Sequence, residues 1–278
     1  MSIFTRFRRL IKRKRKSTLR LGLALGSGGA KGMAHLGALK AFEEEGIRFD
    51  VVTGTSIGSI VGALYAKGYS SSDMTEIVQS LSVKEFSKNL RPRADMGFAE
   101  ELLSGYVEGD ISDLPIPFAA WATDEETNEG VLLDHGNVAR ALTASSAMPP
   151  FFRAVEIDGK KLADGAFTNA IPADVARDLG AYFVIGCDLS AYLLPDEEKS
   201  RLSRLIGSAL NAFVSLRYRE DSKERGYQAS DIMLRPNLLG FTATDIGRED
   251  TARMYELGYE EAVSRMPEIR KALKDAGF

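Results

Sequence analysis

The sequence predicts a single α/β domain, preceded by a basic arm over residues 1–20. Short apolar runs typical of buried strands alternate along the chain with longer segments in which apolar residues recur at helical spacing. The chain has 278 residues, of which 44% are hydrophobic, and this is enough to form one large core. We therefore expect residues 21–278 to fold as one domain.

The expected strands are short and are separated by helical segments. They cover residues 21–25, 51–54, 116–123, 131–133, 155–162, 182–188 and 232–234, and Asp158-Gly159 predicts a hairpin turn inside the fifth run. The last helix is expected over 248–274, with Met254, Leu257, Ala262 and Met266 facing the body. Residues 70–109 contain no motif. We expect either a surface cap near the site entrance or an ordinary pair of packed helices, and the sequence favours neither.

Ser56 lies at the junction of an expected strand and an expected helix, in Gly54-Thr55-Ser56-Ile57-Gly58. In this setting GxSxG is typical of a nucleophile elbow, a turn so tight that glycines must flank the serine. The helix that follows points its unpaired amides and positive end toward any charge developing on a substrate oxygen. An ordinary glycine-rich turn is the alternative.

A second glycine cluster, Gly26-Ser27-Gly28-Gly29-Ala30-Lys31-Gly32, follows the first expected strand. Backbone amides in such a loop can converge on one anion, as an oxyanion hole requires. A nucleotide-binding loop is the competing interpretation. The spacing disfavours it, because Lys31 stands where GxGxxG needs its third glycine and Gly32 follows the lysine instead of preceding it.

The third motif is Asp164 in Ala163-Asp164-Gly165-Ala166, which follows the expected hairpin. Alone, an Asp-Gly pair is most often a turn. In this chain order, however, the three motifs resemble those of the patatin-like phospholipase family. The stretches 138–152 and 231–236 are also similar to the bacterial branch of that family, and one departure is Ser27, where many members have glycine.

The resemblance implies a three-layer α/β/α fold with a central, mostly parallel sheet and a serine-aspartate dyad. Ser56 would be the nucleophile and Asp164 the base, the amides of Gly28 and Gly29 would form the oxyanion hole, and the substrate would be an acyl lipid. The supporting motif residues would be Ser27, Lys31, Gly32, Gly54, Gly58, Gly165 and Ala166. No metal or cofactor is implied.

A dyad requires the carboxyl group to do the work of a histidine, so its pKa must rise. We expect burial near Phe151, Phe152 and Phe167 to raise it. A triad would need one of the two histidines. His35 is expected to pack or cap beside the glycine loop and His135 to lie in an exposed turn, so neither is expected to be the base. A non-catalytic lipid-binding regulator on the same fold stays open as an alternative function.

The N-terminal arm carries the strongest charge asymmetry in the chain. It has nine basic residues and no acidic ones, whereas the remainder has 27 Lys plus Arg against 39 Asp plus Glu. The basic residues are Arg6, Arg8, Arg9, Lys12, Arg13, Lys14, Arg15, Lys16 and Arg20, and Ile3, Phe4, Phe7, Leu10 and Ile11 recur beside them at helical spacing. An amphipathic helix lying on an anionic membrane is therefore expected, with a solvated tail as the alternative.

The sequence disfavours nucleic-acid binding, secretion and a membrane-spanning segment. Nucleic acid is not an expected partner, because stacking aromatics beyond Phe4 and Phe7 are lacking and the acidic body would repel phosphate. Cleavage as a secretory signal would destroy the first strand, and no apolar run approaches the roughly 20 residues that span a bilayer. Cys187, the single cysteine, excludes an intramolecular disulfide and fits the cytoplasm, and both it and Trp121 are expected to pack in the core.

Overall fold

The computed structural model describes residues 19–83, 94–190 and 221–278. Most of the expected arm, residues 1–18, lies outside this part of the chain. Arg20, counted with the arm by its charge, belongs to the folded body: its guanidinium donates to the carbonyls of Leu179 (2.9 Å) and Asp50 (3.1 Å).

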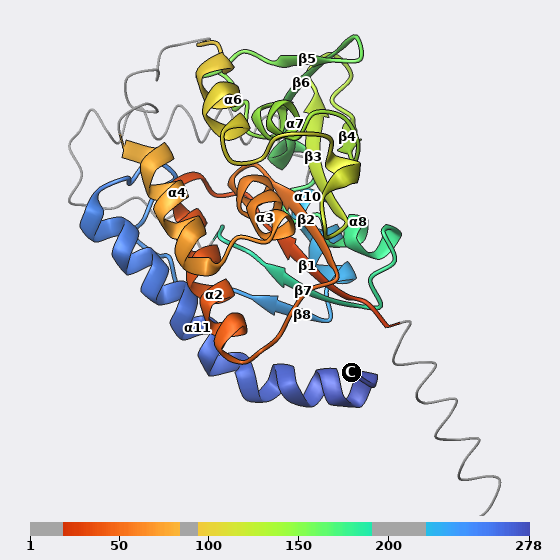
Figure 1. Cartoon of the computed structure of the whole chain (residues 1–278), viewed down its shortest axis with the longest axis vertical. Helices are drawn as coiled ribbons and strands as arrows, with labels where there is room; N and C mark the ends of the chain where they lie inside the picture. The colour runs from red at the N-terminus through yellow and green to blue at the C-terminus, as the bar shows by residue number, and fades with distance from the viewer. Residues whose placement is uncertain (1–18, 84–93, 191–220) are drawn as a thin grey trace, which may run out of the picture.

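One eight-stranded sheet runs through the described residues in the order β5-β6-β3-β2-β1-β7-β8, with β4 paired to β3 (Figure 1). The strands are β1 (Leu21–Leu25), β2 (Val51–Thr55), β3 (Phe118–Asp124), β4 (Gly130–Leu133), β5 (Val155–Ile157), β6 (Lys160–Asp164), β7 (Phe183–Cys187) and β8 (Ile232–Leu234). The pairs that join β3, β2, β1, β7 and β8 are parallel, whereas β4, β5 and β6 pair antiparallel. The sheet is therefore mostly parallel, as expected.

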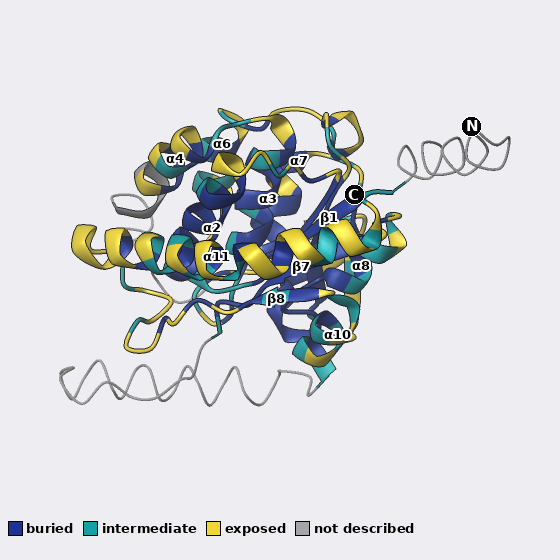
Figure 2. Cartoon of the chain, turned by 90° about the horizontal axis from the view of Figure 1, so that it is seen from below, coloured by how far each residue is buried: buried dark blue, intermediate teal, exposed yellow. Residues whose placement is uncertain are grey.

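Helices cover both faces of the sheet and give the expected three layers. On one side lie α2 (Met33–Glu44), α3 (Ile57–Lys67), α4 (Ser71–Val83) and α11 (Arg248–Ala276), and on the other α8 (Ala173–Asp178) and α10 (Asp221–Ala229) (Figures 1 and 2). Two further helices, α6 (Gly97–Ser104) and α7 (Val138–Ser145), lie near the β5-β6 end. The described residues also form three short 3-10 turns, η1 (Gly29–Gly32), η2 (Ile111–Asp113) and η3 (Gly165–Phe167).

The long C-terminal helix packs closely on α2. A Cβ atom placed on Gly258 would lie 1.9 Å from the Ala34 carbonyl oxygen, so the two backbones touch where glycine removes the side chain. Met254, Ala262 and Met266 are buried along this contact, as the helical spacing predicted, and Leu257 is only half-buried. The outer face of α11 is exposed (Figure 2).

The structure changes two of the strand boundaries that the sequence predicted. β3 begins at Phe118 instead of residue 116, because Pro117 has no N–H for the ladder, although its carbonyl accepts from Val52 N at 2.9 Å. The run 155–162 divides into β5 and β6 around Asp158 and Gly159, whose φ angles are 50° and 75°. The predicted hairpin turn is confirmed.

Within residues 70–109, the described part consists mainly of two helices, α4 and α6, that pack on other helices. α4 contacts α2 and α3, and α6 contacts α7. Met96 and Phe98 at the start of α6 cluster with Ala147 and Phe152. Residues 84–93 lie outside the described residues.

Candidate active site

Ser56 occupies a sharp turn between β2 and α3. Its φ and ψ angles are 56° and −126°, a conformation that costs a non-glycine residue energy and persists only where the surroundings enforce it. The flanking glycines allow the turn. A Cβ atom on Gly54 would lie 2.2 Å from the Gly58 carbonyl oxygen, and one on Gly58 would lie 2.2 Å from the Leu25 carbonyl oxygen.

The register of the sheet brings Asp164 to the level of Ser56. Thr55, the last residue of β2, pairs with Trp121 of β3, and the next residue of β3, Ala122, pairs with Asp164 at the end of β6. Because adjacent strands lie about 4.8 Å apart, the backbones of residues 56 and 164 are separated by roughly two strand spacings. Side chains can bridge such a gap.

The carboxyl group of Asp164 is buried and oriented by the backbone. Its Oδ1 accepts from the Ala166 amide at 2.9 Å, which caps η3. Burial raises the pKa of Asp164 from 3.8 to about 6, while the hydrogen bond from Ala166 and the contact with the Ser56 hydroxyl lower it. Among the described residues, Oδ2 has no hydrogen bond of normal geometry. Serine and carboxyl therefore adjoin without a fully formed hydrogen bond, as is common before substrate binds.

The glycine-rich loop lies against the first turn of α3. A Cβ atom on Gly32 would lie 2.1 Å from Cγ1 of Ile57, the residue after Ser56. Most amides of the loop are engaged: Gly26 donates to Cys187 O (3.0 Å), Ser27 to Ala170 O (3.0 Å), Ala30 to Ala243 O (2.8 Å) and Lys31 to Gly28 O (3.2 Å).

The amides of the two glycines in the middle of the loop are not engaged in this way. Within the part of the chain that the structure describes, the amides of Gly28 and Gly29 have no hydrogen-bond partner. Gly29 has φ 58°, and a Cβ atom on it would lie 2.5 Å from the Ala243 carbonyl oxygen, so glycine is required there. The loop can thus offer two backbone donors to an anion beside the elbow. Lys31 of the same loop is buried.

Both histidines lie where the sequence predicted. His35 is fully buried, and its Nε2–H donates to the Gly26 carbonyl at 2.8 Å, which fixes the start of the glycine loop. Burial lowers the pKa of His35 to about 4, so the ring is neutral at pH 7. His135 is exposed and pairs with Asp134 at 2.7 Å. Neither ring has a hydrogen bond to Ser56 or Asp164 among the described contacts.

Cys187 and Trp121 follow the sequence-based interpretation in part. The Cys187 thiol is buried, and burial raises its pKa, so it stays protonated. Trp121 is half-buried, and its indole N–H donates to Thr168 Oγ1 at 2.9 Å.

One residue of the site received no role from its sequence context. Ser145 ends α7 inside the stretch 138–152 and is fully buried. Its Oγ accepts from the Ser56 amide at 2.9 Å and donates to the Trp121 carbonyl at 2.7 Å. A pair of adjacent serines is no signal in itself, so only the three-dimensional contact reveals it.

A serine on a strained strand-to-helix turn, beside a buried carboxyl group and a glycine-rich loop, is typical of α/β hydrolases that use a serine nucleophile. A sequence model described as Patatin-like phospholipase matches residues 23–177. The chain is 31% identical to Patatin-like phospholipase domain-containing protein 6 of Mus musculus over 86% of this chain and 20% of that protein. It therefore belongs to the patatin-like phospholipase family.

Further comparisons concern a bacterial relative and the fold. The chain is 33% identical to an uncharacterized NTE family protein of Mycobacterium tuberculosis over 63% of this chain and 50% of that one. It thus spans a fifth of the mouse relative and half of the mycobacterial one. VipD from Legionella pneumophila is similar in fold, with a TM-score of 0.60 at 16% identity over 90% of this chain and 67% of that chain. Human GIVD cytosolic phospholipase A2 has a TM-score of 0.56 at 10% identity over 94% and 61%.

Proposed function

We propose that this protein is a lipid acyl hydrolase in which Ser56 attacks the ester and Asp164 is its base. The observation that carries the proposal is the contact between the hydroxyl group on the strained elbow and a buried carboxyl group whose pKa is about 6. At pH 7 that carboxyl group is mostly ionised, yet it is basic enough to accept a proton in the transition state. Relatives with phospholipase in their names support a lipid ester as the substrate.

The reaction would proceed in two steps. Ser56 Oγ forms a bond to the ester carbonyl carbon as Oδ2 of Asp164 takes its proton, and the amides of Gly28 and Gly29 bind the resulting oxyanion. Asp164 then gives the proton to the departing alcohol. A water molecule cleaves the acyl-enzyme in the same way, with Asp164 again accepting and returning the proton, which regenerates Ser56.

The glycine loop can serve this chemistry because its donors are fixed before the reaction. The start of the loop is held by three hydrogen bonds: the His35 ring donates to the Gly26 carbonyl, and the amides of Gly26 and Ser27 donate to the carbonyls of Cys187 and Ala170. Fixed donors need no reorganisation when charge appears on the oxygen, which makes them effective in a site with little water.

We further propose that the enzyme works at an anionic membrane surface and that the basic arm binds that surface. The support is the arm's nine basic residues and its apolar residues at helical spacing. Each basic group near such a surface contributes about 1 kcal/mol to the free energy of binding. In the described part of the chain, no helix has the length and apolar character needed to cross a bilayer. The arm itself lies outside the described residues, apart from Leu19 and Arg20.

Phosphonate labelling and ester turnover test the catalytic proposal together. The wild type should react with a fluorophosphonate at Ser56 and hydrolyse a phospholipid, a lysophospholipid, an acylglycerol or an acyl-CoA. Ser56→Ala and Asp164→Asn should abolish turnover, with about a thousandfold or greater loss expected when a nucleophile or base is removed.

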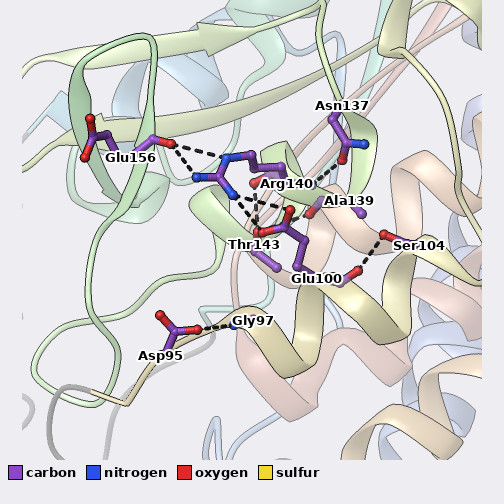
Figure 3. Close-up of polar contacts among 9 residues, drawn as sticks. All are labelled: Asp95, Gly97, Glu100, Ser104, Asn137, Ala139, Arg140, Thr143 and Glu156. Carbon is purple, nitrogen blue, oxygen red and sulfur yellow. Dashed lines mark hydrogen bonds and ion pairs between the residues drawn. The ribbon is translucent and has the colours of Figure 1, made fainter.

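Two matched controls come from α6 and the turn before it. Ser104→Ala and Asp95→Asn make the same chemical changes at exposed residues whose contacts are local, to the Glu100 carbonyl and the Gly97 amide (Figure 3). Both controls should keep wild-type turnover. Full turnover by Ser56→Ala or Asp164→Asn would refute the dyad, and wild-type protein that neither labels nor turns over would favour a lipid-binding regulator.

A further inference from the structure

The end of α7 contacts both members of the proposed dyad. Ser145 Oγ accepts the Ser56 amide hydrogen at 2.9 Å, and two residues later the Ala147 carbonyl accepts from the Asp164 amide at 3.0 Å. Residues 145–147 therefore bridge the elbow and the end of β6. In the described structure Ser56 follows β2 and Asp164 ends β6, and this segment contacts both residues directly.

The bridge rests on the carbonyl group of Trp121. Ser145 donates its own hydroxyl hydrogen to that oxygen at 2.7 Å. The same oxygen lies against the residue after the base, since a Cβ atom on Gly165 would be 2.1 Å from it. Ser145, Gly165 and the backbone of β3 thus meet at one point, and the Ser145 hydroxyl group acts both as donor and as acceptor.

The helix that carries Ser145 is anchored at its other end. Asn137 caps α7 by accepting from the Arg140 amide at 2.9 Å, and the Arg140 guanidinium donates to the Glu100 carboxylate (3.1 Å) and the Glu156 carbonyl (2.8 Å) (Figure 3). These contacts tie α7 to α6 and β5. Because the helix is fixed, its last residue can impose a position on the elbow.

The Ser56 backbone needs such a partner. Its φ of 56° is unfavourable for serine, and its amide is buried, so without Ser145 that N–H would be left unpaired beside a strained residue. A relaxed turn would move the Ser56 hydroxyl away from the carboxyl group. Displacements of about 1 Å in a reacting group can reduce a rate by about a hundredfold.

We propose that Ser145 is a positioning residue, which holds the Ser56 amide and thereby keeps the nucleophile in register with Asp164. This inference rests on the proposed function. It assigns to Ser145 no contact with substrate, so its loss should reduce kcat and leave KM nearly unchanged.

The test compares Ser145→Ala with Thr143→Val in the full-length protein. Thr143 is equally buried in the same helix, but its hydroxyl group donates within α7, to the carbonyls of Ala139 and Arg140 (Figure 3). Both variants lose one buried hydroxyl, and only Ser145→Ala removes the contact with Ser56. The measurements are kcat and KM on a soluble ester, the rate constant for fluorophosphonate labelling, and the melting temperature.

We expect Ser145→Ala to lower kcat and the labelling rate constant by at least about tenfold at unchanged KM, while Thr143→Val keeps wild-type kcat at a similar loss of melting temperature. Ser145→Cys, which keeps the shape of the side chain with a larger γ atom that is only a weak donor and acceptor, should lower kcat as well, and it serves if the alanine variant does not fold. Wild-type kcat in a folded Ser145 variant would overturn the inference, and so would an equal loss of kcat in Thr143→Val. The proposed function survives both outcomes. It fails if the wild type is inactive or if Ser56→Ala or Asp164→Asn is active, and the positioning role then fails with it.

Discussion

Replacing Asp164 by asparagine should abolish turnover and stabilise the fold, by an amount that depends on pH. Asparagine has the shape of aspartate and keeps an Oδ1 that can accept from the Ala166 amide, but it carries no charge. The wild-type carboxyl group is buried and ionised at neutral pH, and the rise of its pKa measures what that ionisation costs the folded state.

The size of the effect follows from the two pKa values. Below pH 3.8 the carboxyl group is protonated in both folded and unfolded chains, so it makes no difference. Between pH 3.8 and about 6 the unfolded chain releases the proton and the folded chain retains it, so the free energy of unfolding falls as pH rises. At about 1.4 kcal/mol per pKa unit, the loss above pH 6 is about 3 kcal/mol.

Urea unfolding at a series of pH values measures this, with the fluorescence of the single tryptophan, Trp121, as the signal. The advantage of Asp164→Asn over the wild type should grow by about 3 kcal/mol between pH 3.5 and pH 8. A difference that does not change with pH, or that shrinks as pH rises, would refute the argument that burial dominates at Asp164.

Asp188 provides the control. It is also buried, and burial alone would raise its pKa, but hydrogen bonds from Ser190 and Tyr227 outweigh burial and leave the pKa lowered. Because its pKa is lowered from 3.8, the Asp188 carboxyl group is ionised in both the folded and the unfolded chain from pH 4.5 to pH 8, the upper part of the pH series. Asp188→Asn should differ from the wild type by a constant amount across that interval.

Three further predictions concern the rate, the elbow and the arm. The acid limb of the kcat/KM profile should have an apparent pKa of about 6, with activity rising as pH increases because Asp164, the proposed base, must be ionised; a pH-rate series that stays flat down to pH 4.5 would contradict this. Gly58→Ala should leave little folded protein in a thermal unfolding assay, since its Cβ atom would lie 2.2 Å from the Leu25 carbonyl oxygen, whereas Gly105→Ala, with 3.4 Å to its nearest neighbour and φ −67°, should melt like the wild type. Deletion of residues 1–18, which retains the Arg20 contacts, should weaken sedimentation with anionic vesicles and remove its sensitivity to salt without changing turnover of a soluble ester; equal sedimentation of both forms at low salt would refute the role of the arm.

The sequence allowed those parts of the fold to be predicted whose causes are local. Buried parallel strands are continuous apolar runs, so β1, β2 and β7 were found within one residue of their observed ends. The hairpin turn at Asp158 and Gly159 was found because both residues tolerate positive φ. The start of β3 was misplaced by two residues because Pro117 lacks the donor that a strand residue needs.

The site divides in the same way. The glycines of the elbow and loop could be identified because they stand at fixed positions in recognisable motifs. The atoms that leave no room for a side chain there, such as the carbonyl oxygens of Leu25 and Ala243, belong to other segments of the chain. No comparable sequence motif identified Ser145 as part of the site. Its hydroxyl group connects residues 24 and 89 positions away, and a serine at the end of a helix has many ordinary reasons to be there.

These contacts suggest how a dyad can work without a third residue. In a triad a buried aspartate orients the histidine, and that histidine is the base. In the proposed dyad the base is the aspartate itself, and backbone groups orient it: the Ala166 amide donates to Oδ1, and the Asp164 amide donates to the Ala147 carbonyl. Because Oδ1 accepts from Ala166, Oδ2 is the oxygen that would receive the Ser56 proton in the proposed reaction. Backbone groups in a packed core have little freedom to move. In the proposed dyad, η3 and the residues at the end of α7 would therefore orient the base, as a buried aspartate side chain does in a triad.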